Sequence, residues 1–177
     1  ESAIRAVIER YLERPSDRDR AQAAQLLASG EPEEAVLLLE KVLREEPDNI
    51  DAQVERVEAL TLAGRADAAA EHLASLPVQA LDAPRLKAIE ARVLLARSLA
   101  GQPGEDELQQ RLESEPGNPA IACALAARQF LAGRVEPALD RWLGVLRTDR
   151  SFGDGLARRS LLAAFDLLEG QEERVNA

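Results

Sequence analysis

Residues 30–39 read GEPEEAVLLL, residues 64–73 read GRADAAAEHL and residues 133–142 read GRVEPALDRW. In each stretch an alanine follows the glycine after five residues, and a large apolar residue comes four positions later. Gly30 and Gly64 are 34 residues apart, and Gly64 and Gly133 are 69 apart, which is close to twice that distance. The chain is therefore predicted to contain an internal repeat of about 34 residues.

A second marker has the same spacing, because Pro47 and Asn49 recur 69 residues later as Pro116 and Asn118. Helical periodicity runs through nearly the whole chain, and no segment shows the sustained alternation of a strand. A period near 34 residues is typical of the tetratricopeptide repeat (TPR), a hairpin of two helices. The predicted fold class is all-α: a right-handed superhelix (solenoid) of about four TPR-like hairpins, with an N-terminal linker helix and a C-terminal capping helix.

Prolines and glycines set the predicted boundaries. A linker helix is expected over residues 1–15. The third hairpin is expected to be degenerate, because the turn at residues 101–104 is long and the helix after it is short. A capping helix that Asp154 opens, followed by a tail, is expected over residues 151–177. The four hairpins are predicted at residues 16–49, 50–83, 84–118 and 119–150.

The repeated residue types have a physical reason. Glycine tolerates the positive φ of a tight turn between two helices, so helix A of the first hairpin is expected to end near Gly30. Alanine recurs at Ala35, Ala69 and Ala138 because the two helices of a hairpin approach closely there. A larger side chain would push those helices apart.

Composition limits the function classes. The formal net charge of −10 argues against nucleic-acid binding, which needs cations to neutralise phosphates. The single cysteine, Cys123, cannot form an intrachain disulfide and is expected to be a small buried apolar side chain in a reducing compartment. No apolar run approaches the roughly 20 residues of a membrane span. The chain has no methionine, so it is expected to be a piece of a longer protein.

The sequence predicts no enzyme and no cofactor. His72 is the only histidine, so a metal site or a catalytic triad lacks further ligands or a second base. His72 is expected to be a solvated surface side chain. No Gly-x-Ser-x-Gly elbow and no phosphate-binding glycine loop accompanies it.

Protein binding remains, and the helix A residues of a TPR stack face a concave groove. An apolar groove would suit extended or partly unfolded protein segments. The alternative is that several of these side chains pack against the neighbouring repeat. The residues expected to line the groove are Val54, Glu58, Leu62, Cys123, Ala127 and Phe130.

One TPR subtype binds the C-terminal carboxylates of chaperones through asparagine and cationic side chains of helix A. The corresponding positions here include Arg20, Ala24, Asp51 and Glu55. Asparagine is missing and two of the positions are acidic, so this mode of binding is not expected.

The segment Arg147-Thr148-Asp149-Arg150-Ser151-Phe152-Gly153-Asp154, followed by Ala157-Arg158-Arg159-Ser160-Leu161-Leu162, resembles the C-terminal signature of the chaperedoxins. These bacterial co-chaperones (the YbbN or CnoX type) join a thioredoxin-like domain to C-terminal TPRs. The opening residues 1–5 resemble the helix between the two parts, and the likeness covers essentially the whole chain.

The resemblance implies a cytoplasmic, non-catalytic module of a stress-response holdase. Its parent protein would hold unfolding client proteins and pass them to the chaperonin (GroEL) and Hsp70 (DnaK) systems, without nucleic acid or membrane. Any redox chemistry would lie in the thioredoxin-like domain, outside this chain. Two alternatives remain open: a generic TPR scaffold that docks one folded partner, and the substrate-selecting module of a thiol-disulfide oxidoreductase.

Overall fold

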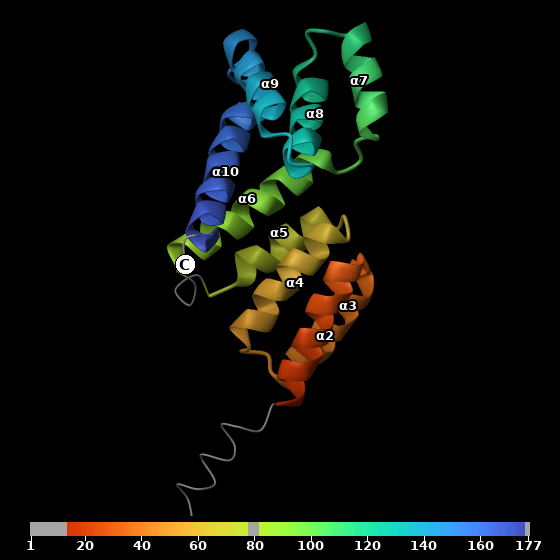
Figure 1. Cartoon of the computed structure of the whole chain (residues 1–177), viewed down its shortest axis with the longest axis vertical. Helices are drawn as coiled ribbons and strands as arrows, with labels where there is room; N and C mark the ends of the chain where they lie inside the picture. Colours follow the sequence, from red (N-terminus) through yellow and green to blue (C-terminus); the bar gives the residue numbers. More distant parts are fainter. Residues whose placement is uncertain (1–13, 78–81, 176–177) are drawn as a thin grey trace, which may run out of the picture. The chain divides into compact units, whose positions relative to one another are not determined.

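The computed structural model describes residues 14–77 and 82–175, and side chains up to Glu169. The chain divides into two compact units after Leu76. Every regular element among the described residues is a helix, so the predicted all-α class is confirmed (Figure 1). The linker helix predicted over residues 1–15 lies almost entirely outside the described residues. The helices of the first unit are α2 (Pro15–Ser29), α3 (Pro32–Glu45), α4 (Ile50–Leu62) and α5 (Ala66–Ser75).

The first unit is built from consecutive helices that pack against one another. Helix α3 packs against both α2 and α4, and α5 packs against α4. Helices α2 and α4 are also in contact, which is how equivalent helices of neighbouring repeats stack. Its core combines small and branched side chains that are almost completely buried, including Ala35, Leu39, Ala52, Val57, Leu60 and Ala69.

The turns at Gly30, Gly64 and Gly133 have the same pattern of hydrogen bonds. Gly30 has φ 81°, in the left-handed region, and the next residue, Glu31, donates its N–H to the carbonyl of Leu26 at 2.8 Å. This bond satisfies a carbonyl that the last turn of α2 leaves free. Equivalent turns occur at Gly64 (φ 75°) and Gly133 (φ 79°), with bonds from Arg65 to Leu60 at 2.9 Å and from Arg134 to Gln129 at 2.8 Å.

Each repeated alanine lies in the first turn of the second helix of its hairpin. Ala35, Ala69 and Ala138 are all completely buried, which agrees with the close approach expected from the sequence. The large residues four positions later differ more, since Leu39 and Trp142 are completely buried while Leu73 is partly exposed.

The two Pro-x-Asn junctions are helix caps. Asn49 accepts a hydrogen bond from the N–H of Ala52 at 3.1 Å, and Asn118 accepts from Ala120 and Ile121 at 3.0 and 3.3 Å. Both asparagines also donate from Nδ2 to the glutamate three residues earlier, at 2.8 Å in each case. The side-chain oxygen thereby satisfies N–H groups that the first turn of α4, or of α8 (Pro119–Leu131), leaves without intrahelical partners.

The second unit has five helices among the described residues. Helix α6 packs most extensively against α10, and α7 packs against α8. The predicted third hairpin therefore contains two helices, α6 and α7, whose main partners lie elsewhere in the unit; the division into four hairpins stays a prediction. The helices are α6 (Ala83–Leu99), α7 (Glu105–Ser114), α8 (Pro119–Leu131), α9 (Val135–Thr148) and α10 (Phe152–Val175).

Residues 153–155 have left-handed φ/ψ values that interrupt α10, so its continuous right-handed part begins after Gly155, next to the Asp154 that is predicted to open the helix. Asp149 accepts hydrogen bonds from the backbone N–H groups of Ser151 and Phe152 at 3.1 and 3.0 Å, so it holds the turn that begins α10. Asp154 has φ 55° and lies between two glycines that also have positive φ. Its backbone is therefore left-handed, and its side chain makes no cap. Phe152 packs against the core of the unit.

The turn glycines generate a testable prediction. A Cβ at Gly64 would meet no atom within 4 Å, so alanine there suffers only from the positive φ. We expect Gly64→Ala to lower the free energy of unfolding by about 1 kcal/mol. Gly144 lies inside α9, where a Cβ also meets nothing within 4 Å. We expect Gly144→Ala to raise that free energy by about 0.5–1 kcal/mol.

Urea denaturation followed by circular dichroism measures both changes. If the two alanines shifted stability in the same direction, the left-handed turn would not be the reason that glycine is required at position 64.

Candidate protein-binding surface

Helix α4 carries three of the six predicted groove residues on one face, since Val54, Glu58 and Leu62 are four residues apart. Their exposure rises along the helix. Val54 is buried in the core, Glu58 is partly exposed, and Leu62 at the end of α4 is 64% exposed. Leu62 is thus the predicted groove residue that a partner can reach most directly.

Helix α8 carries the other three, and all of them lie inside the second unit. Cys123, Ala127 and Phe130 are buried and belong to one core cluster that also contains Trp142. The rings of Phe130 and Trp142 have centroids 5.9 Å apart and are tilted by 47°. These three side chains are brought together, but as core packing; a binding role for them stays a prediction.

The thiol of Cys123 lies in this core. Burial raises its pKa to about 11, because the apolar surroundings disfavour the thiolate. The thiolate is the reactive form of cysteine, so this side chain is a poor nucleophile near neutral pH.

The helix A positions that correspond to the carboxylate-binding TPR subtype form an internal ion-pair cluster. Arg20 on α2 binds both carboxylate oxygens of Glu55 on α4, with the shortest distance, 2.6 Å, from Nη2 to Oε1. Asp51 and Asp17 lie 3.5 and 3.8 Å from the same guanidinium group. The hydrogen bonds that Arg20 donates to Glu55, together with the nearby carboxylates, raise the pKa of Arg20. An incoming carboxylate would have to displace Glu55, which supports the expectation that this mode is absent.

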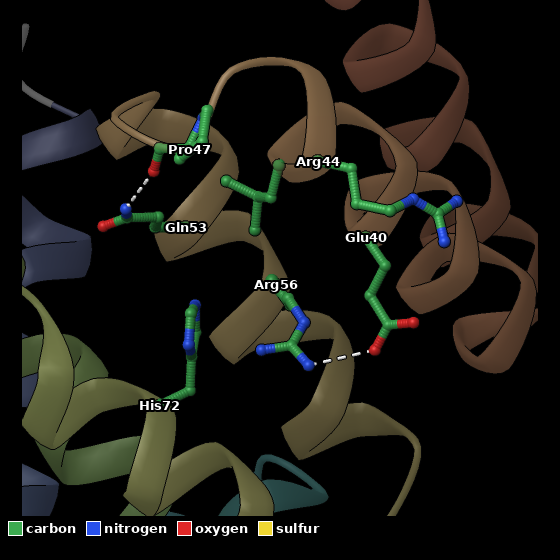
Figure 2. A pocket seen from close by; sticks show the side chains of 7 residues that line it. Glu40, Arg44, Pro47, Gln53, Arg56 and His72 are labelled. Carbon is green, nitrogen blue, oxygen red and sulfur yellow. Dashed lines mark hydrogen bonds and ion pairs between the residues drawn. The ribbon is translucent and has the colours of Figure 1, made fainter.

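A pocket of about 370 Å³ lies between α3, α4 and α5. Arg56 donates to Glu40 at 2.9 Å, and the amide of Gln53 donates to the carbonyl of Pro47 at 2.6 Å. Both interactions are drawn as dashed lines in Figure 2. Three buried side-chain atoms along its wall have no hydrogen-bond partner in the described structure: Gln53 Oε1, Arg56 Nε and His72 Nε2. The residues that line the pocket are Glu40, Leu43, Arg44, Pro47, Gln53, Arg56 and His72.

His72 corrects a prediction from the sequence. It was expected to be solvated, yet it is partly buried and lines this pocket. Burial lowers its pKa below the usual 6.5, and the charge of Arg56 lowers it further. The imidazole is therefore held in its neutral form near pH 7. The sequence around His72 does not indicate this burial, because the burial results from the approach of α4 and α5.

Among the residues of the two described ranges, no group of three or more histidine, cysteine, aspartate or glutamate side chains is placed to hold a metal ion. No helix in the same ranges has the length and apolar character needed to cross a membrane.

Two family models, each described as tetratricopeptide repeat, match the chain, one over residues 26–93 and the other over residues 98–177. The chain contains tetratricopeptide repeats. The prediction of an all-α fold built from helical repeats is thereby confirmed, and the second match includes α10. No curated protein sequence matches the chain. A crystal structure of a domain of unknown function from Vibrio parahaemolyticus is 25% identical, with a TM-score of 0.42, and the match covers 87% of this chain and 88% of that one.

TPR domains act by binding protein, so apolar side chains that the fold leaves exposed are candidate contact points. Sequence reasoning found Leu62 and missed the others, although Leu37 can be recognised because it lies outside the buried stripe of α3. Leu37 is 65% exposed. Among the side chains that the structure describes, the exposed large apolar residues are Leu37, Leu62, Leu131, Leu143, Leu162 and Phe165.

The depressed pKa of His72 predicts a pH dependence. A histidine with a lower pKa in the folded state than in the unfolded state binds fewer protons when the protein is folded. The folded protein therefore loses stability as the pH falls through 6.5. His72 is the only histidine. We therefore expect the free energy of unfolding of the native chain to fall more steeply than that of His72→Gln between pH 7.5 and pH 5.5.

Urea titrations of both proteins at several pH values give this difference. Parallel pH profiles for the native chain and the variant would contradict the prediction.

Proposed function

We propose that this chain is the protein-binding module of a cytoplasmic, thioredoxin-like co-chaperone. It holds client proteins as they unfold and passes them to chaperonin and Hsp70 systems, without itself catalysing a reaction. The observation that carries the proposal is the segment from Arg147 to Leu162, which resembles the chaperedoxin signature and lies within the second tetratricopeptide repeat match. TPRs by themselves support protein binding of any kind, so the segment is what favours a co-chaperone.

The exposed leucines support the mechanism. An unfolding client exposes apolar side chains, and contact with Leu37 or Leu62 removes apolar surface on both partners from water. Each such contact contributes only about 25 cal/mol for each Å² buried, so one leucine cannot hold a client. Several weak contacts suit a holdase, because the client must later be released.

Aggregation of a chemically unfolded model protein tests the holding activity. We expect the chain in stoichiometric excess to reduce light scattering, and Leu37→Glu/Leu62→Glu to lose part of this effect. The matched control is Gln22→Glu/Gln25→Glu, which adds the same charge at two exposed positions of α2 without removing apolar surface. Full aggregation in the presence of the native chain would count against the holdase proposal.

The transfer step needs the full-length parent protein. We expect the immobilised parent to capture purified chaperonin. Recovery from cell extract of one folded partner, with no chaperonin and no protection of clients, would favour the generic scaffold instead.

A further inference from the structure

Helix α10 carries an exposed stripe on the side away from the core of the second unit. Arg158, Leu162, Phe165 and Glu169 are separated by four, three and four residues, so they lie on one face of the helix. All four are exposed, and Leu162 and Phe165 are 49% and 48% accessible. The opposite side of α10 is buried in the core, through Ala157, Leu161, Ala164 and Leu167.

The centre of this stripe is apolar, because Leu162 and Phe165 are neighbours on the exposed face of α10. Large apolar side chains that gather on an exposed face indicate a contact surface. The charged residues at its ends are unused: within the described ranges neither Arg158 nor Glu169 makes an ion pair or a side-chain hydrogen bond.

The order of the four residues determines which partner fits. Along the helix they are a cation, two apolar residues and an anion, and the spacing of four, three and four is the same read from either end. This spacing is also that of the seam of a coiled coil. If a second α10 packs in the antiparallel direction, Leu162 faces Phe165 of the second copy and Arg158 faces Glu169 of the second copy. A parallel partner would instead place arginine against arginine and glutamate against glutamate.

We propose that this stripe docks a second copy of the same chain, as an antiparallel pair of α10 helices related by a two-fold axis. A two-fold interface requires a surface that is complementary to itself, and the stripe meets that requirement in both charge and apolar contact. The charges beside the stripe are also complementary in this arrangement. Arg159 follows Arg158 and Asp166 follows Phe165, so both lie on the same flank of the stripe and have opposite signs. Arg159 also donates to the carbonyl of Gly153 at 2.9 Å, and Asp166 lies 4.0 Å from Lys87.

The size of the surface sets the strength of the pair. A stable interface buries about 800 Å² on each partner, and three turns of one helix provide much less. The dimer is therefore weak and reversible, and self-association has to be measured at concentrations up to about 1 mM.

The test is sedimentation velocity of the whole chain over this range, with circular dichroism to verify the fold of each variant. We expect Leu162→Glu/Phe165→Glu to remain monomeric throughout. We expect Arg158→Glu and Glu169→Arg each to weaken self-association about fivefold or more, because each places like charges at both ends of the interface. The matched control is Arg44→Glu, which makes the same charge change at an exposed position of α3. This variant should change the self-association constant less than twofold.

Two combinations isolate the antiparallel arrangement. The double variant Arg158→Glu/Glu169→Arg restores opposite charges and should return self-association to within about twofold of the native chain. An equimolar mixture of the two single variants should associate more strongly than either alone, because both ion pairs form only in the mixed dimer. A native chain that stays monomeric at 1 mM, or a double variant that fails to recover while folded, would overturn the proposal.

Discussion

The close contact between two helices at a completely buried alanine is the constraint on which the repeat depends. Ala35, Ala69 and Ala138 have no exposed surface, and each follows a left-handed glycine by five residues. The glycine reverses the chain within one residue, and the alanine lets the second helix lie against the first. The other apolar residues of the second helix then meet those of the first helix, so their burial depends on this first contact.

The same constraint explains why the third predicted hairpin packs differently. Gly101 also has a positive φ, of 69°, but five residues later the chain has Asp106, which is exposed on α7. Helix α7 thus has no small side chain at the point of approach, and it packs against α8 instead. The apolar side of α6 is covered by α10, where Leu95 joins the same core cluster as Leu161.

Local patterns account for the part of the fold that could be predicted, and contacts between helices account for the rest. The turn at Gly30 depends on neighbouring residues alone, so the sequence predicts it. Whether Val54 faces a groove or the core depends on which helix packs beside α4, and the sequence does not contain that information in any local form. The same holds for Cys123 and for His72, whose neutral form results from burial next to α4.

Some charged residues pair with each other inside one unit, and others do not. Arg20 is committed to Glu55 within the first unit, whereas Arg158 and Glu169 on α10 have no partner within the described residues. If these two join a second copy, the dimer presents Leu37 and Leu62 twice, because neither lies in the α10 stripe. Contacts that are weak singly become effective when one client meets several of them at once, since the second contact forms at a high effective concentration. A weak dimer would in this way strengthen the holding of long unfolded segments, while short segments would still be released quickly.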